Sequence, residues 1–426
     1  MMNWNTTACP QEISAEIATW AYRFNLVRER PVFFACPDFE FEEHSLNKVA
    51  SELLELKNLI YDLPQRLKLS HSEFLQIQGM PNDLLRFAAH DDVSWRPKIF
   101  RPDCILTPDG LKVIEMNIDN GALAMYGEIY AKSFFNLNTK LRQFWWQQSH
   151  GGLDGVLKTF DLFAKYLMEK QTSGHKIFWW DLKDRPQELE NERAQVIESL
   201  RKKGLDVSLI LGEDILTVPH ESKTYVFRTF AYVHFFNEGH DLQEIFERIP
   251  SRLIEQGDLG INSALYDNKV NMDLLRSRDV LDVLSEKEHD LVQRLIPETY
   301  KLGKGQETPK IILRDKDAWT CKAGIGFQGK HVRLGSEYSP EEWALHLMSV
   351  VQDPRSWIIQ KRVEPIPISI QATNGLEWKT LGAGHIVNFF FVGDHFAGTW
   401  LRVSNHREKI GAPDGINTIL ALPKIV

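Results

Sequence analysis

The segment from Lys98 to Asn117 constrains the fold most, because it contains two short β-type runs joined by a turn signal. The runs are KIFRPDCIL and LKVIEMN, and the residues TPDG separate them. Asp-Gly between such runs indicates a β-hairpin, since the turn needs a positive φ. Side chains alternate between the two faces of a strand, so Glu115 and Asn117 share a face of the second strand. The sequence therefore predicts a hairpin on which Asp103 of the first strand converges with these two residues.

Asp103, Glu115 and Asn117 form a candidate magnesium site. Carboxylate and amide oxygens are the hard ligands that Mg²⁺ prefers, with nucleotide phosphates and water completing its shell. Arg101 shares a face with Asp103 and is placed to donate two hydrogen bonds to the same phosphate. The alternative is an exposed hairpin with scattered charges. The run VIEMN argues against it, because it places the two polar side chains beside apolar ones with no cation between them.

A second candidate is the glycine-bearing stretch KAGIGFQGKHV, which begins at Lys322. Gly324, Gly326 and Gly329 predict a flexible loop between two strands. The backbone N–H groups of such a loop can close over phosphates, and a lysine on the preceding strand can neutralise them. The stretch matches neither a Walker A sequence nor a Rossmann fingerprint, so an ordinary glycine-bearing hairpin is the alternative.

Two later strands carry further candidates. The stretch WIIQKRVEP predicts an apolar strand ending in Gln360, Lys361 and Val363, a pattern suited to binding adenine through backbone groups. An ordinary buried strand is the alternative. Arg402, in GTWLRVS, is a lone arginine on a strand and gains meaning only if the first hairpin lies nearby.

The rest of the chain alternates helical and β-type patterns. Apolar residues recur every three or four positions over residues 43–63 and predict a helix that Pro64 ends. Residues 127–148 also read as helix. The stretches HKIFWW, DVSLIL and TYVFRTF predict three strands, with an amphipathic helix before the second that stops at Gly204, in a mainly parallel α/β unit. From residue 261 onward the pattern is α+β, with a helix over residues 268–285, a capping box at Ser339 and a hairpin around Gly393.

Composition restricts the class of partner. The formal net charge is -8 and no block of Lys and Arg occurs, so neither nucleic acid nor an anionic membrane is expected as a partner. No run approaches 18 apolar residues, and the first residues do not resemble a signal peptide. The four cysteines form no CxxC pair, which argues against a zinc site or a disulfide framework. We expect a cytoplasmic protein.

Two histidines and two cysteines accompany the candidate residues. His385 and His395 lie near the last strands, where one could deprotonate an attacking amine, but polar surface positions are the favoured interpretation. Alternation turns Cys104 away from the face of Asp103, and Cys321 away from that of Lys322. We therefore expect both cysteines in the core.

These motifs, in this order, resemble those of the circularly permuted ATP-grasp proteins, and in particular the synthetase domain of the glutathionylspermidine synthase type. The resemblance rests on R-x-D, the D-G turn, E-x-N, YDNKVNMDLL, CKAGIGFQGKHV, WIIQKRV and AGTWLRVS, and covers roughly residues 85–405. It implies that Lys269 and Lys322 contact ATP phosphates, that Gly326 and Gly329 lie in a loop covering them, and that Arg402 faces the transferred phosphate. It also implies an adenine-binding hinge at the end of the WIIQKRV strand.

The sequence pattern and the resemblance together predict a mixed α+β and α/β fold in four parts, the first of them from the helical pattern alone. Residues 1–95 form a helical segment, and 96–150 the magnesium-binding hairpin and a helix of the permuted ATP-grasp core. Residues 151–260 form a pre-ATP-grasp α/β domain, and 261–426 the remainder of the ATP-grasp domain.

The implied function is ATP- and Mg²⁺-dependent ligation. The γ-phosphoryl group of ATP would activate a small-molecule carboxylate as an acyl phosphate, which an amine then attacks to give an amide, ADP and phosphate. Arg101 and Arg402 would stabilise the phosphorus centre and the oxyanion. Two alternatives stay open: loading of an amino acid onto a carrier-protein thiol, and non-catalytic nucleotide binding.

Overall fold

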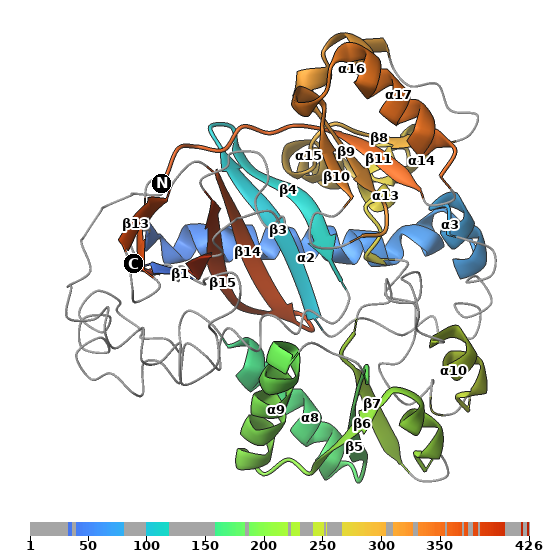
Figure 1. Cartoon of the computed structure of the whole chain (residues 1–426), viewed down its shortest axis with the longest axis vertical. Coiled ribbons are helices and arrows are strands. Elements are labelled where there is room, and N and C mark those ends of the chain that lie inside the picture. Colours follow the sequence, from blue (N-terminus) through green and yellow to red (C-terminus); the bar gives the residue numbers. More distant parts are fainter. Residues whose placement is uncertain are drawn as a thin grey trace.

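The structure is a computed structural model, and it combines helices with both antiparallel and parallel sheets (Figure 1). It describes residues 33–35, 40–80, 99–118, 158–183, 187–219, 223–230, 242–250, 253, 266–303, 310–326, 331–353, 356–368, 370–373, 378–381, 384–404, 419–420 and 424–425. Within these ranges, no helix is both long and apolar enough to cross a membrane.

The central sheet has the strand order β15-β14-β3-β4 and is antiparallel throughout. Its strands are β3 (Ile99–Thr107), β4 (Gly110–Asn117), β14 (Gly384–Val392) and β15 (His395–Ser404). The predicted first hairpin is confirmed, with Pro108 and Asp109 as its turn. Gly110 follows at φ 104° and pairs with Thr107, so the positive φ falls on glycine, where it carries no steric cost. The second hairpin is also confirmed, and Gly393 in its turn has φ 58°.

The two faces of the central sheet differ in chemistry. One face is apolar, and Cys104, Val113 and Val387 on it join the main hydrophobic core. The opposite face carries Asp103 and Glu115, which lie directly across from each other on β3 and β4. Because alternation is local, this division into faces is the part of the fold that the sequence predicts most directly.

Helix α2 (Glu43–Arg66) passes behind the central sheet and packs its apolar stripe into the same core (Figure 1). The helix was predicted to end at Pro64, but it continues to Arg66. Proline lacks only its own N–H, and the following turn is still formed by the Leu67 amide donating to the Leu63 carbonyl at 2.9 Å. Pro64 therefore precedes the helix end by two residues.

A second antiparallel sheet has the order β10-β9-β11-β8 and lies beside β4 (Figure 1). Its strands are β8 (Thr299–Leu302), β9 (Trp319–Ala323), β10 (Val332–Leu334) and β11 (Trp357–Lys361). Helices α16 (Lys310–Arg314) and α17 (Pro340–Val351) cover it and share a separate core with it, which includes Trp343. The predicted capping box is present, since Ser339 accepts from the Glu342 amide and Glu342 from the Ser339 amide.

The predicted α/β unit is confirmed. Strands β5 (Lys176–Asp181), β6 (Val207–Leu211) and β7 (Thr224–Arg228) form a parallel sheet with the order β6-β5-β7. Helix α8 (Thr159–Thr172) precedes β5, and α9 (Gln187–Lys202) connects β5 to β6. Gly204, at φ 87°, follows the end of α9 as expected. Helix α10 (Leu242–Arg248) follows β7 in the chain.

Short elements depart most from the sequence-based expectation. The segment expected to be mainly helical contains α3 (His71–Ile77) but also β1 (Phe33–Ala35) and β2 (Glu40–Phe41). Strand β1 lies in a sheet of order β13-β12-β1-β16, formed with β12 (Ile370–Thr373), β13 (Trp378–Leu381) and β16 (Ile419–Leu420); β2 pairs with β17 (Lys424–Ile425). Strands this short depend on partners more than 300 residues away, which no local pattern reveals.

The helix expected over residues 268–285 is divided. It consists of α13 (Val270–Leu274) and α14 (Arg278–Leu281), and α15 (Glu286–Leu295) follows. Ser277 precedes α14, and its hydroxyl donates back to the Leu274 carbonyl of α13 at 2.7 Å. Ser285 caps α15 by accepting from the Glu288 amide. The helix expected over residues 127–148 lies outside the described residues.

Candidate functional site

Asp103 is the centre of a polar cluster on the central sheet. Its side chain is only 4% exposed, and its carboxylate accepts from Arg101 Nε at 3.1 Å and from a guanidinium nitrogen of Arg402. Asn117 Nδ2 also donates to Asp103 Oδ1, at 3.2 Å. Burial alone would raise the pKa of Asp103, but the two arginines outweigh it and lower the pKa below its usual value. Asp103 is therefore a buried carboxylate that remains ionised.

Asn388 is the cluster member that the sequence-based reasoning missed. It lies on β14 directly opposite Asp103 and donates from Nδ2 to Asp103 Oδ1 at 2.5 Å. Its own Oδ1 accepts from Trp400 Nε1 and from Arg402 Nε, each at 2.8 Å. One signal could have identified it, because Asn388 is the amide within the otherwise apolar run IVNFFFV.

Glu115 connects the hairpin to the chain before α13. Its Oε1 lies 2.8 Å from Lys269 Nζ, and this lysine also donates to the Gly326 carbonyl at 3.0 Å. Lys269 is buried, which opposes its protonation, but Glu115 and Asp267 raise the pKa of Lys269 above its usual value. A single charged lysine thus links β4 to the start of the glycine-bearing loop.

Lys322 makes a second connection between the two sheets. From β9 its Nζ donates to the Ile114 carbonyl of β4 at 3.1 Å and to Gln360 Oε1 of β11 at 2.7 Å. Burial lowers the pKa of Lys322 to about 8, although the nearby Glu115 opposes this shift. Lys322 is therefore a buried amine whose acceptors are neutral oxygens.

Strand β4 borders the second sheet (Figure 1). The contacts of Glu115 with Lys269 and of Lys322 with β4 place several of the predicted side chains at this border. They come from segments far apart in the chain. Strand β14 pairs with β3 on one side and with β15 on the other, and this brings Arg402 of β15 to Asp103. Arg101 and Arg402 pair with Asp103, and Lys269 pairs with Glu115. Such an arrangement can exchange its internal ion pairs for contacts to an anionic group and to a cation bound beside it.

The oxygen donors fit a hard divalent cation. Asp103 and Glu115 are opposite each other across two paired strands, and the register places Asn117 opposite Arg101 on the same face. The amide nitrogen of Asn117 donates hydrogen bonds to Asp103 Oδ1 at 3.2 Å and to the Arg101 carbonyl at 3.1 Å. The amide oxygen is the atom of Asn117 that can serve as a metal ligand. The described residues contain no group of three His, Cys, Asp or Glu that could hold a metal. The predicted ligands are two carboxylates and one amide, so they do not form such a group of three.

The three predicted hinge residues differ in their exposure to solvent. The side chain of Gln360 is buried, accepts from Lys322 and donates to Thr299 Oγ1 at 3.2 Å. Lys361 is exposed, and its backbone amide donates to the Glu298 carbonyl at 2.7 Å. Val363 follows the end of β11 and is half-buried. Gly326 is described, whereas Gly329 lies outside the described residues.

One of the two histidines contradicts the interpretation as polar surface. His385 on β14 is fully buried, because it faces the apolar side of the sheet rather than the side of Asp103. Its Nε2 accepts from the Leu106 amide at 3.2 Å, and burial lowers the pKa of His385 to about 4. His395 is exposed, as predicted. Cys104 and Cys321 are buried in the two cores, as predicted, and burial raises the pKa of both thiols.

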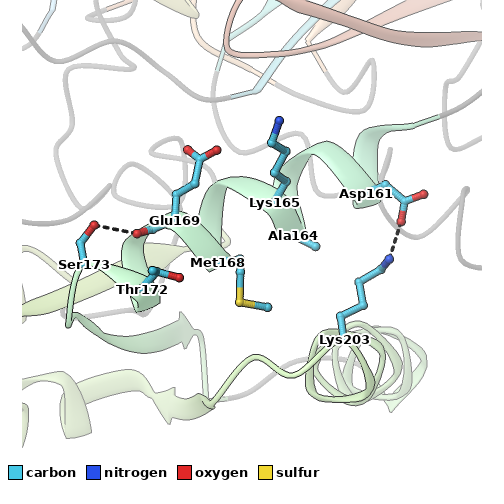
Figure 2. Close-up of a pocket in the computed structure, with 8 residues that line it drawn as sticks. All are labelled: Asp161, Ala164, Lys165, Met168, Glu169, Thr172, Ser173 and Lys203. Carbon is cyan, nitrogen blue, oxygen red and sulfur yellow. Dashed lines mark hydrogen bonds and ion pairs between the residues drawn. The ribbon is translucent and has the colours of Figure 1, made fainter.

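A separate pocket lies on the α/β unit (Figure 2). It has a volume of 610 Å³ and is lined by one side of α8 and by Lys203, which forms an ion pair with Asp161 at 2.8 Å. None of the residues that sequence reasoning singled out lines it. Its charged side chains are half-buried or exposed, so we assign the candidate site to the cluster around Asp103 instead.

Comparison with known proteins gives a likeness of fold. No family model matches the chain, and no curated protein matches it. Among solved structures, the chain is similar to a glutathione synthetase-like effector (GSS30) from Globodera pallida in its apo form. The TM-score is 0.61, with 13% sequence identity over 100% of both chains. A putative gamma-glutamylcysteine synthetase from Methylobacillus flagellatus matches 87% of each chain with a TM-score of 0.43 and 12% identity, a likeness too low to carry an argument. The first likeness shows that the two chains share a fold.

Proposed function

We propose that this chain is an ATP- and Mg²⁺-dependent ligase that releases ADP and joins a small-molecule carboxylate to an amine. The observation that carries the proposal is the convergence of Asp103, Glu115, Lys269, Lys322 and Arg402 at the border of two sheets. The shared fold with a glutathione synthetase-like protein supports it. We also propose that the fold is a circularly permuted ATP-grasp fold divided at the residue bounds given above, with the short strands β1 and β2 as well as helices in its first part.

Ligand binding explains why the fold tolerates the free-energy cost of burying several charged side chains together. Buried charges are expensive unless they are paired, and a buried ion pair is often no more stabilising than an apolar pair of similar volume. A site that must hold a divalent cation and several phosphate oxygens needs charges of both signs close together. A buried charge cluster of this kind is therefore better explained by ligand binding than by stability.

Each group then has a defined role. Asp103 would exchange some of the hydrogen bonds that its carboxylate now accepts for Mg²⁺, which Glu115 and the Asn117 amide oxygen would also hold. When bound, the ion supplies positive charge to the phosphates. Lys269 and Lys322 would exchange their present acceptors for phosphate oxygens, and the backbone around Gly326 would lie over them. The hinge at Gln360, Lys361 and Val363 would hold the adenine.

Arg101 and Arg402 would act on the reacting group. A carboxylate is a poor electrophile, because oxide would have to leave. Transfer of the γ-phosphoryl group to its oxygen forms an acyl phosphate and ADP, and attack by the amine then expels phosphate. The proton that the amine nitrogen loses ends on the departing phosphate, which balances the step. The two guanidinium groups would stabilise negative charge that develops during both steps.

The test is ADP release with Mg²⁺ and ATP against a panel of amino acids, glutathione, polyamines and small peptides, with mass spectrometry of the products. We expect release that depends on one acid, and hydroxylamine should trap that acid as a hydroxamate. Release without a hydroxamate would contradict the acyl phosphate step. Tight ATP binding with no release on any acid would instead favour a carrier-protein acceptor or a site that only binds nucleotide.

A further inference from the structure

Asn388 is a polar residue in a strand whose side chains are all buried. All nine residues of β14 are buried, and the Asn388 side chain is fully inaccessible to solvent. A buried amide must satisfy its hydrogen-bonding groups, so its place in an apolar strand requires partners. Those partners are Asp103, Trp400 and Arg402, on both neighbouring strands.

The partners fix the orientation of the amide. Trp400 Nε1 and Arg402 Nε are donors only, and each lies 2.8 Å from Asn388 Oδ1. A reversed amide would place its NH₂ group against two donors and its oxygen against the Asp103 carboxylate. Only one orientation is compatible with all three neighbours.

The same contacts fix Arg402 relative to Asp103. The Nε of Arg402 donates to Asn388, while its Nη2 donates to Asp103 Oδ2. Asp103 Oδ1 is occupied by Arg101, Asn117 and Asn388, so the two arginines use different oxygens of one carboxylate. Asn388 thus holds one edge of Arg402 and shares Asp103 Oδ1 with Arg101.

We propose that Asn388 is a positioning residue, which sets the Arg402 guanidinium at a fixed orientation beside Asp103 so that its remaining edge faces the reacting phosphoryl group. The inference rests on the proposed function, because the role of Arg402 does. Asn388 touches neither nucleotide nor acid in this assignment. It acts through Arg402, by removing the rotational freedom that a lone arginine on a strand would keep.

The first arm of the test needs no ligand. In the ¹⁵N spectrum of the whole protein, the Arg402 Nε–H signal is identified by its absence in Arg402→Lys. We expect this signal to shift and broaden in Asn388→Leu, because its acceptor is gone. It should persist in Thr399→Val, a control of equal shape that removes only the 2.7 Å bond from Thr399 Oγ1 to the Asn388 carbonyl. An unchanged signal in Asn388→Leu overturns the inference.

The second arm is a double-mutant cycle on ADP release. We expect Asn388→Leu to lower kcat by about tenfold or more in the natural chain but by less than about threefold in Arg402→Lys, with KM for ATP nearly unchanged. An equal loss in both backgrounds would indicate general structural damage and overturns the inference. Asn388→Thr, which suits a strand interior, replaces the leucine variant if that variant does not fold.

The two proposals fail separately. If the natural chain releases no ADP and binds no Mg-ATP, the proposed function and the catalytic part of the inference are both wrong. If it is active but the cycle is additive, only the inference is wrong.

Discussion

At the scale of single residues, the cluster shows how buried charges are kept ionised. Asp103 keeps a lowered pKa because two arginines offset its burial, and Lys269 keeps a raised pKa because carboxylates do the same. Lys322, whose hydrogen-bond acceptors are neutral, has its pKa lowered to about 8. The difference follows from the charge of the nearest acceptor.

Glu115 gives the first prediction at this scale. We expect Glu115→Ala to lower kcat for ADP release by at least about 10², a typical loss for one strong electrostatic stabiliser. Glu115→Gln should show a similar loss while keeping an oxygen near Lys269. Glu52→Gln is the matched control, because Glu52 pairs with Arg294 at the surface, 2.9 Å away. Near-normal turnover in Glu115→Ala would refute the assignment of this carboxylate to the metal.

His385 gives a prediction of pH dependence. Its pKa is lowered from 6.5 to about 4 in the folded chain, so between these values the unfolded chain binds more protons on this residue. Stability should therefore fall as the pH falls from about 6.5 to about 4, by about 3 kcal/mol from this residue. Urea unfolding should show a flatter pH profile in His385→Gln, while His395→Gln, at an exposed position, should keep the natural profile. Equal profiles in the natural chain and His385→Gln would contradict the buried, neutral assignment.

At the scale of elements, short sequence patterns predicted those features that depend only on neighbouring residues. The hairpins, the faces of β3 and β4, the end of α9 and the cap of α17 all follow from turn residues, alternation or capping, and the structure has them. The pairing of β3 with β14 joins Asp103 to Asn388, 285 residues later. No pattern within a short window specifies that pairing, so Asn388 could not be assigned to the cluster from the sequence.

Lys57 of α2 gives a prediction for one element. It is buried and donates to the Gly393 carbonyl and to Asp394 Oδ1, both at 2.8 Å, and so fastens the β14–β15 turn to the helix. Lys57→Met keeps most of the volume but removes both bonds. We expect a loss of about 1.5–3 kcal/mol in the free energy of unfolding, the scale of hydrogen bonds to a charged group. Lys48→Met, on an exposed part of the same helix, should change it by less than about 0.5 kcal/mol. A Lys57→Met protein as stable as the natural chain would contradict this role.

At the scale of the whole molecule, the long helix and the central sheet form a frame to which the second sheet is attached. Three ion pairs connect α2 to α15, the helix that leads into β8: Arg66–Glu288 at 2.7 Å, Lys287–Glu55 at 2.7 Å and Arg294–Glu52 at 2.9 Å. Lys269 and Lys322 provide the connections on the side of the candidate site. The early hairpin of β3 and β4 is completed by β14 and β15, which come from near the end of the described chain.

The measurement that tests the central claim most directly is calorimetric titration of ATP into the whole protein, with and without Mg²⁺. We expect binding that requires Mg²⁺ in the natural chain and is lost or weakened at least about tenfold in Asp103→Ala and Glu115→Ala. Lys165→Ala and Lys203→Ala, in the pocket on α8, should bind like the natural chain. Unchanged binding in the first pair, or loss in the second pair alone, would contradict the placement of the nucleotide site at the border of the two sheets.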